Sequence, residues 1–273
     1  MLFLMGSISF SETAAVSVKI INHRGYNTVA PENTLPAFEL SAEKGYTFVE
    51  TDVCFTKDFV PVLLHDPIIN HTARNGDGSG ILSVTGISDL TYEEVLSYDF
   101  GIWKGEEYAG IKIPTFGAFL SLCGERGLHP YIELKENGKY RQEQIAGLVD
   151  MVRERGMQNG VTWISLNAEY LKWVRDQDPD ARLGWLVAVW FSQDQFRSIL
   201  RKITELRTGS NEVFLDANIF MLLLSPGGSD WCIDMCRAAG IPLEIWTLDS
   251  EAVKNQLDPY ITGITTNSIL PGK

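Results

Sequence analysis

Short runs of β-branched and aromatic residues alternate with longer helical patterns along almost the whole chain. This alternation is typical of βα units, whose strands assemble into a parallel sheet. Eight runs have the composition of strands: 18–22, 46–53, 130–134, 161–165, 182–187, 212–216, 243–248 and 261–265. Eight strands with intervening helices in 273 residues match the usual size of a closed (β/α)8 barrel, roughly 250 residues. We therefore predict an α/β fold of the TIM barrel class rather than an open sheet.

Helical patterns fill the segments between these runs. The predicted helices are 34–44, 116–125, 142–155, 168–176, 193–206, 229–239 and a short one from residue 250. Gly127, Gly156 and Gly240 stand where three of them should end, because glycine readily adopts the left-handed conformation found at helix C-termini.

One segment interrupts the alternation after the second strand. Residues 57–64 have the pattern of a hairpin return, and residues from about 66 to 112 are rich in Gly, Ser and Asp. Because a structureless loop of that length is uncommon in a compact domain, we predict an insertion that covers one face of the barrel. Nothing in the composition marks a linker, so we expect a single barrel domain over residues 1–273 that carries this insertion.

The charge of the chain argues against one large class of function. The 23 basic and 35 acidic side chains give a net charge of -12. Nonspecific binding of nucleic acid depends on clustered Lys and Arg, so we expect no nucleic-acid partner. The four cysteines form no CxxC pair and have no set of histidine partners, which argues against a zinc knuckle or a thioredoxin-type motif.

The hydrophobic runs are too short for a membrane protein. No stretch approaches the roughly 18 apolar residues of a transmembrane helix, so we expect no stable membrane insertion. The first ten residues, MLFLMGSISF, lack the basic start and the cleavage site of a signal peptide. We therefore expect a cytoplasmic protein, with export left open, and the sequence does not predict an oligomeric state.

Polar residues gather where the predicted strands end, which is where the active sites of TIM barrels form. The first strand leads into His23 and Arg24, and the hairpin return ends at His65. The second strand carries Glu50 and Asp52, whose i, i+2 spacing directs both side chains to the same side of the strand. The remaining candidates at these ends are Glu133, Lys135 and Trp246.

Three of these residues suggest a cation site. Glu50, Asp52 and Glu133 would repel one another at neutral pH unless a proton or a cation were shared between them. Ligation by oxygen alone suits Mg²⁺ or Ca²⁺ better than Zn²⁺. The alternative is that the three acids form a buried salt-bridge network with Arg24 and Lys135.

The two histidines have the properties of an acid–base pair. His23 and His65 can each take and give a proton near neutral pH. Arg24 offers paired donors suited to the oxygens of a phosphate, although it can also pair with a carboxylate such as Glu32. Lys135 can neutralise the same phosphoryl group as a point charge, or serve as a Schiff-base nucleophile.

The order and spacing of these residues resemble the glycerophosphodiester phosphodiesterase family. The opening signature of that family, His-Arg-Gly, Pro-Glu-Asn-Thr and Ala-Phe, is matched by residues 23–25, 31–34 and 37–38. The later elements Glu-x-Asp-Val, His-Asp and Glu-x-Lys are matched by residues 50–53, 65–66 and 133–135. The resemblance covers the chain from about residue 18 to the C-terminus, and the combination is more specific than any single tripeptide.

The resemblance implies a TIM barrel with a small insertion after the second strand. It also implies a small-molecule glycerophosphodiester as substrate, cleaved to glycerol 3-phosphate and an alcohol. The implied site consists of Glu50, Asp52 and Glu133 around a divalent cation, His23 and His65 as acid and base, Lys135 and Trp246 in the pocket, and Glu32 and Asn33 beside it. Asn33 or Thr34 would also cap the first helix.

Two departures from the family pattern bear on which alcohol group the substrate carries, and bear less on the type of reaction. The family usually has Asn after the Trp-Thr-Val of the seventh strand and Asp after the eighth strand, whereas this chain has Asp249 and Asn267. The insertion, with His71, Arg74, Tyr92 and Trp103, is not matched residue by residue, and Trp103 is expected to pack rather than to bind a ligand.

Three other functions remain alternatives at this stage. The first is phospholipase-like cleavage of an intact lipid phosphodiester, which an exposed apolar rim beside the pocket would favour. The second is a Schiff-base aldolase that uses Lys135. The third is a catalytically silent barrel that binds a phosphodiester.

Overall fold

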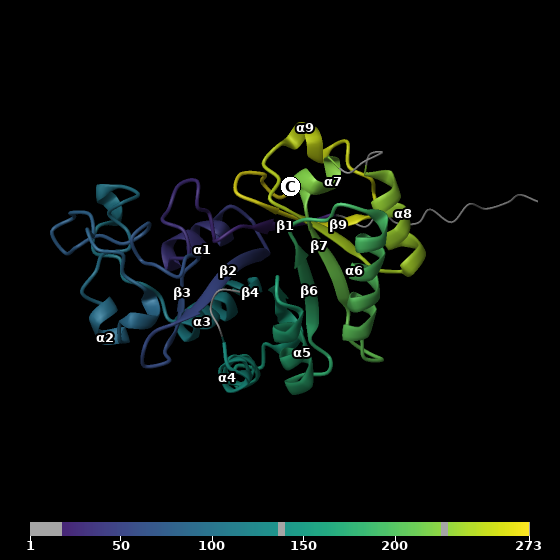
Figure 1. The fold of residues 1–273 in the computed structure, drawn as a ribbon. Helices are drawn as coiled ribbons and strands as arrows, with labels where there is room; N and C mark the ends of the chain where they lie inside the picture. Colours follow the sequence, from purple (N-terminus) through teal and green to yellow (C-terminus); the bar gives the residue numbers. More distant parts are fainter. Residues whose placement is uncertain (1–17, 136–139, 225–228, 273) are drawn as a thin grey trace, which may run out of the picture.

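The computed structural model describes residues 18–135, 140–224 and 229–272, so the N-terminal segment considered above as a signal lies outside the described residues. A ring of strands flanked by helices forms the body of the molecule (Figure 1). The described strands are β1 (Lys19–Asn22), β2 (Phe48–Phe55), β3 (Pro61–Leu63), β4 (His129–Leu134), β5 (Thr162–Ser165), β6 (Arg182–Val187), β7 (Val213–Asn218), β8 (Leu243–Trp246) and β9 (Ile261–Thr266).

Eight of these strands close into a parallel barrel. The order is β1, β9, β8, β7, β6, β5, β4, β2, and an additional β1–β2 pairing joins the two ends of the sheet. Ile21 pairs with Thr265 of β9 on one side and with Phe48 of β2 on the other. The TIM barrel prediction is therefore confirmed. The strand β3 pairs antiparallel with β2, as the hairpin pattern predicts, and its Val62 also forms an antiparallel bridge with Thr115.

Helices connect the strands and cover the outside of the barrel (Figure 1). They are α1 (Leu35–Glu43), α2 (Tyr92–Val95), α3 (Phe116–Arg126), α4 (Gln142–Arg153), α5 (Ala168–Gln177), α6 (Gln193–Leu206), α7 (Ile219–Leu223), α8 (Asp230–Ala239) and α9 (Glu251–Lys254), with 3-10 turns at Ile87–Asp89, Glu106–Tyr108 and Gln158–Gly160. Gly127, Gly156 and Gly240 all have positive φ, which agrees with their expected place at helix ends.

Two hydrophobic layers hold the barrel together. A large outer cluster lies between the strands and the helices and includes the buried rings of Phe116, Phe119 and Trp163. A smaller inner cluster fills the barrel and includes Ile164 and Phe214. Burial of both faces explains why most residues of the strands are apolar or β-branched, as is typical of parallel sheets.

Gly184 on β6 makes room for the inner cluster, and this gives a stability prediction. A Cβ at position 184 would overlap the ring of Phe214 and lie 2.8 Å from Ile164 Cγ2. Gly184→Ala should therefore lower the free energy of unfolding by about 1–3 kcal/mol. Gly209→Ala is the matched control, because no atom lies within 4 Å of its added Cβ. Denaturant titration of both variants measures the difference, and equal midpoints would contradict this packing.

The insertion forms a second hydrophobic cluster beside the barrel (Figure 1). Ile69, Val95 and Phe100 pack there against Val62 and Leu64 from the β3 return. Lys104 donates to the backbone carbonyl of Asn27 at 2.6 Å, which ties the insertion to the loop between β1 and α1. The expected insertion thus has a core of its own and shares the β3 return with the barrel. No helix in the described part of the chain is both long and apolar enough to cross a membrane.

Candidate active site

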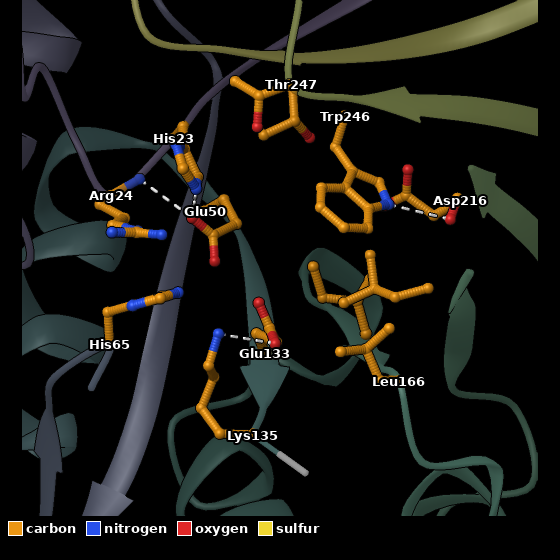
Figure 2. A pocket seen from close by; sticks show the side chains of 13 residues that line it. His23, Arg24, Glu50, His65, Glu133, Lys135, Leu166, Asp216, Trp246 and Thr247 are labelled. Atoms are coloured by element: carbon orange, nitrogen blue, oxygen red, sulfur yellow. Dashed lines mark hydrogen bonds and ion pairs between the residues drawn. The ribbon is translucent and has the colours of Figure 1, made fainter. Parts of the chain in front are cut away.

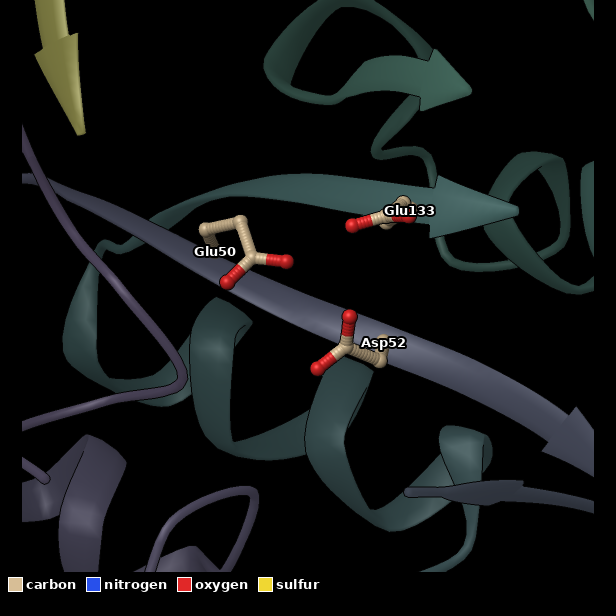
Figure 3. Close-up of side chains that lie close together, drawn as sticks. All are labelled: Glu50, Asp52 and Glu133. Carbon is tan, nitrogen blue, oxygen red and sulfur yellow. The ribbon is translucent and has the colours of Figure 1, made fainter. Parts of the chain in front are cut away.

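The strand β2 places two carboxylates inside the barrel mouth. Its residues alternate between the helix side and the interior, and Glu50 and Asp52 face inward with a two-residue period. Glu133 enters from the neighbouring strand β4, where it pairs in register with Asp52. One oxygen from each of the three side chains lies within 4.8 Å of the others. Figure 3 shows the three carboxylates converging from these two strands.

The turn after β1 has an unusual backbone that orients His23 and Arg24. Arg24 has a φ of 54° and Gly25 a φ of 75°, both in the left-handed region. A Cβ on Gly25 would lie 2.8 Å from Ala37, so only glycine lets this turn pack against α1. The backbone N–H of Arg24 donates to Glu50 Oε2 at 3.0 Å.

The β3 return brings His65 to the same mouth. The Leu64 N–H donates to the carbonyl of Asp52 at 3.1 Å, which places the following His65 beside the inward face of β2. His65 Nδ1 bonds Asp66 Oδ1 at 2.9 Å, and the other oxygen of Asp66 bonds His71 Nδ1. Asp66 therefore links the barrel mouth to the insertion.

Two cations lie among the carboxylates. Lys135 Nζ is 2.9 Å from Glu133 Oε1 and 3.1 Å from Asp52 Oδ1. Arg24 contacts Glu32 Oε1 at 2.9 Å and Asp52 Oδ2 at 3.3 Å. The ion pairs of the salt-bridge alternative are thus present, but they leave the buried Glu50 Oε1 without a hydrogen-bond partner. The cluster is not a closed salt-bridge network.

The three carboxyl groups differ in pKa because their neighbours differ. Burial, followed by repulsion from Asp52 and Glu133, raises the pKa of Glu50 well above its usual value. Burial raises the pKa of Glu133 to about 7 despite the nearby Lys135. Burial alone would also raise the pKa of Asp52, but Lys135 and then Arg24 hold it far below the usual value. Protonation of Glu50 and Glu133 would lower the repulsion within the cluster, and so would a bound cation.

The environment of Lys135 argues against the aldolase alternative. Burial opposes its charge, yet Asp52 and Glu133 raise its pKa above the usual value. A Schiff-base lysine must be deprotonated to attack a carbonyl, so it needs a lowered pKa. Lys135 is instead suited to act as a fixed positive charge.

Asn33 has a different role from the expected helix cap. Thr34 stands at the N-cap of α1, but its side chain makes no cap hydrogen bond and donates to the carbonyl of Pro31 instead. Thr34 is therefore at the predicted N-cap position, but its side chain does not cap the helix. Asn33 Nδ2 donates to Asp52 Oδ2 at 2.8 Å, and Asn33 Oδ1 accepts from Thr51 at 2.9 Å. Asn33 thus positions Asp52.

Asn267 fixes the tautomer of His23. Its Nδ2 donates to Asp249 Oδ2 at 2.8 Å, so its Oδ1 is free to accept. That oxygen lies 2.8 Å from His23 Nδ1 and also accepts from Asn27 Nδ2 at 2.7 Å. Because an amide oxygen only accepts, Nδ1 of His23 carries the proton and Nε2 keeps its lone pair. The two departures from the family pattern are therefore in contact with each other.

His23 is held neutral by its surroundings. Burial, followed by the positive charge of Arg24, lowers its pKa to about 4. Its Nε2 lies 3.9 Å from Glu50 Oε2. An unprotonated Nε2 next to the carboxylate cluster is suited to accept a proton from a nucleophile.

These groups surround a cavity of about 230 Å³ at the strand ends. Its walls differ in polarity, as Figure 2 shows: His23, Arg24, His65 and Lys135 lie on one side, and Leu166 and Trp246 on the other. The indole N–H of Trp246 donates to the backbone carbonyl of Asp216 at 3.1 Å. Glu32 does not line this cavity and instead binds Arg24 from behind.

Sequence reasoning missed Asp216. Asp216 lines the cavity with a buried carboxyl whose pKa is raised well above the usual value by burial and by Glu244. Its position on an inward-facing strand site could have drawn attention to it. The sequence marks Asp66 as part of the His-Asp motif. Its contact with His71 was not predictable, because it depends on how the insertion folds. Trp103, by contrast, donates to the Phe100 carbonyl within the insertion, as expected of a packing residue.

The carboxylate cluster fits a hard divalent cation. Three oxygen ligands lie within reach of one position, and Glu50 Oε1 is buried and lacks a hydrogen-bond donor. Burial of an unpaired carboxylate oxygen is costly, and a cation would relieve that cost. The residues that would hold it are Glu50, Asp52 and Glu133.

Comparison with known proteins shows the family. The model of the glycerophosphoryl diester phosphodiesterase family matches residues 23–270, and the chain belongs to this family. A glycerophosphodiester phosphodiesterase from Caldanaerobacter subterraneus is 27% identical over 249 residues, which are 91% of this chain and 93% of that protein.

Two solved structures have a fold similar to that of this chain. A phosphodiesterase from Oleispira antarctica, in complex with the product sn-glycerol-3-phosphate, is 25% identical with a TM-score of 0.75 over 91% of this chain and 92% of that one. A glycerophosphodiester phosphodiesterase from Agrobacterium tumefaciens shares the fold with a TM-score of 0.70 at 23% identity, over 92% of this chain and 96% of that one.

Proposed function

We propose that this protein hydrolyses glycerophosphodiesters to glycerol 3-phosphate and an alcohol. Membership in the family and the activity named for its relatives support a phosphodiesterase. The solved relative from Oleispira antarctica, with its bound sn-glycerol-3-phosphate, supports this product. The observation that carries the proposal is the convergence of a carboxylate cluster, two histidines and two cations on one cavity.

Fixed positive charge around the cavity would bind and polarise the phosphoryl group. A divalent cation, Mg²⁺ or Ca²⁺, would neutralise negative charge on the phosphoryl oxygens when bound to Glu50, Asp52 and Glu133. Arg24 and Lys135 lie on the same wall and would add donors aimed at those oxygens. Asp52 and Glu133 hold Lys135 in place, so its charge needs no reorganisation during the reaction.

The two histidines differ in their partners, and this suggests a division of roles. His23 is neutral and presents Nε2, so it would take the proton of the attacking hydroxyl group. His65 has the carboxylate of Asp66 at Nδ1, an arrangement suited to the residue that gives a proton. His65 would protonate the oxygen of the departing alcohol as its bond to phosphorus breaks.

The attacking hydroxyl group belongs either to water or to the neighbouring glycerol. The glycerol route forms a cyclic phosphate before glycerol 3-phosphate appears. Phosphorus NMR under single-turnover conditions distinguishes the two routes, because a transient cyclic phosphate identifies the internal route and its absence supports direct attack by water.

The direct test of the proposal is the release of glycerol 3-phosphate. Glycerophosphocholine, glycerophosphoethanolamine and glycerophosphoinositol are supplied to the protein with Mg²⁺ or Ca²⁺. We expect release from at least one of them, and the relative rates rank the alcohols. A folded, metal-loaded protein that binds these substrates without turnover would instead identify a silent barrel.

Replacing Asn267 tests the tautomer assigned to His23. Asn267→Leu removes the acceptor at Nδ1, so we expect kcat to fall roughly 10- to 100-fold while the protein stays folded. The matched variant is the double exchange Asp249→Asn, Asn267→Asp, which keeps an acceptor for His23 Nδ1 and a donor between positions 249 and 267. It should retain most of the activity. Nitrogen NMR of the imidazole should show Nδ1 protonated in the original protein and a mixture of tautomers in the leucine variant. Unchanged kcat in Asn267→Leu would refute the role of this contact.

A further inference from the structure

Asp66 is shared by two histidines, one in the cavity and one at the surface. His65 Nδ1 lies 2.9 Å from Asp66 Oδ1, and His71 Nδ1 contacts the other oxygen, Asp66 Oδ2. In the described part of the chain, Asp66 is the one acid within ion-pair distance of either histidine. The ring of His65 points into the cavity (Figure 2), whereas the side chain of His71 is 68% exposed. The carboxylate therefore connects a histidine of the site to a histidine in contact with solvent.

The positions of the protons in this group follow from the chemistry of a carboxylate. Burial opposes the ionisation of Asp66, but hydrogen bonds from His71 and His65 hold its pKa below the usual value. An ionised carboxylate only accepts hydrogen bonds, so both histidines carry a proton on Nδ1. His65 can then give a proton only from Nε2, and only while its ring is a cation. The negative charge of Asp66 stabilises that cation.

The turn that carries His71 does not need this side chain for its shape. The backbone N–H groups of Thr72 and Ala73 both donate to the Ile69 carbonyl, at 3.2 and 2.8 Å. The side chain of Ile69 is fully buried in the cluster of the insertion. Main-chain hydrogen bonds and this burial fix the turn, so the exposed imidazole of His71 adds little to packing.

We propose that His71 is a positioning residue, which acts on His65 through Asp66. Its hydrogen bond holds the carboxylate in place beside His65, and its charge sets how much of the negative charge of Asp66 is left for His65. A neutral His71 leaves that charge to the His65 cation. A protonated His71 competes for it, so that His65 releases its proton more readily. The consequence for catalysis rests on the proposed function, in which His65 protonates the departing alcohol.

The other charged groups around the two histidines are common to every variant of His71. Arg74 Nη1 donates to the backbone carbonyl of Ala73 at 2.7 Å and to that of His71 at 3.3 Å. The carboxylate of Asp99, on the segment that pairs with Arg74, accepts from three backbone N–H groups. The titratable and charged groups on the barrel side of His65 are Glu32 and Asp52 beside the cavity, and His23, Arg24, Glu50, Glu133 and Lys135 along it.

The test compares two exchanges of His71 that differ in charge. His71→Asn keeps a hydrogen-bond donor for Asp66 and is always neutral, whereas His71→Arg keeps a donor and is always positive. The measurement is the pH profile of kcat/KM for glycerophosphocholine, with a cation concentration that is saturating at each pH. We expect the alkaline limb, where His65 loses its proton, to lie at lower pH in His71→Arg than in His71→Asn. The original protein should lie between them.

The expected difference between the two variants is about 3- to 10-fold in kcat/KM at a fixed pH on the alkaline limb. A nearby charge at a partly exposed site shifts an ionisation by roughly half a unit to one unit, and the limb falls about tenfold per unit. A purely structural role of His71 would instead lower kcat at every pH and leave the limb in place. His71→Gln and His71→Lys form a second pair with the same charges, should either variant fail to fold.

The same exchanges at a distant histidine control for the change in total charge. His129 is the exposed first residue of β4, at the end of the strand opposite the mouth. His129→Asn and His129→Arg should leave the alkaline limb in place. In an Asp66→Asn background, the difference between His71→Asn and His71→Arg should largely disappear, because the carboxylate that couples the two histidines is gone.

Proton NMR of the imidazole rings measures the same coupling without substrate. The chain has four histidines, and single substitutions assign their signals. We expect the midpoint of the His65 titration to move between His71→Arg and His71→Asn in the same order as the alkaline limb. The Asp66→Asn background should remove most of that movement.

Several outcomes would overturn the inference, and they are distinct from failure of the proposed function. Equal His65 midpoints in His71→Asn and His71→Arg would remove the inference and leave the turnover of glycerophosphocholine standing. A limb that moves while the His65 midpoint stays fixed would assign the limb to another group and remove it as well. If no substrate is turned over, the proposed function fails, and the NMR midpoints alone decide whether His71 acts on His65 through Asp66.

Discussion

His65→Ala should lower kcat for glycerophosphodiester hydrolysis by roughly a factor of 10² to 10⁴, the usual contribution of a general acid or base. His23→Ala should have an effect of the same size. Because acid and base act in one step, the double variant should lose little more than either single variant. The measurement is the steady-state release of glycerol 3-phosphate, with circular dichroism to verify the fold.

A histidine outside the cavity serves as the control. His129 is the first residue of β4 and is exposed. It lies at the end of the barrel opposite the mouth that holds the candidate site. His129→Ala should leave kcat within about twofold of the original value, the range expected of a surface substitution. Full activity in a folded His65→Ala variant would remove the acid–base pair from the mechanism and leave charge stabilisation as the source of catalysis.

Removal of divalent cations should abolish turnover, and added Mg²⁺ or Ca²⁺ should restore it. A bound cation contributes several kcal/mol of charge stabilisation, so the loss should exceed about a thousandfold. Glu50→Gln keeps the size of the side chain and removes a ligand charge, so it should weaken the cation affinity. EDTA-resistant turnover would refute the cation site, and the cation that restores the highest kcat/KM would be the preferred one.

The cation requirement should depend on pH in a defined direction. Without a cation, burial gives Glu133 a pKa of about 7, so this carboxyl group is protonated below that pH. A cation must displace this proton and that of Glu50, whose pKa is also raised. The apparent affinity should therefore rise by about tenfold or more per pH unit between pH 5 and 7, and continue to rise until both carboxyl groups are ionised. Cation titrations monitored by activity at several pH values test this slope. A flat profile would mean that Glu133 does not bind the cation.

The barrel was predictable because each strand is a short run rich in β-branched, aromatic or other apolar residues between two turn signals. The run at 182–187 coincides with β6 (Arg182–Val187). The helix α7 (Ile219–Leu223) was not predicted, because it follows β7 without a break and has only five residues, too few for a helical period. The side chain of Asn218 caps it by accepting from Phe220 N–H at 2.9 Å, and this asparagine was its one local signal.

The candidate site was predictable only in part. The i, i+2 spacing of Glu50 and Asp52 follows from strand geometry alone, and the structure brings them together with Glu133. Contacts that join residues far apart in the chain do not show in local patterns. His23 and Asn267 are 244 positions apart in the sequence, so no local pattern indicates their hydrogen bond.

The β3 return has a consequence for how this protein loses activity. His65 follows β3, which pairs with β2 and bridges Thr115 but is not part of the closed ring, and its neighbour Leu64 packs in the small cluster of the insertion. The carboxylates, by contrast, belong to the closed ring of eight strands. Segments with small cores open more readily than the body of a domain. Local opening of the insertion would therefore withdraw one histidine while the barrel stays folded, so that stress could silence the enzyme reversibly before it denatures.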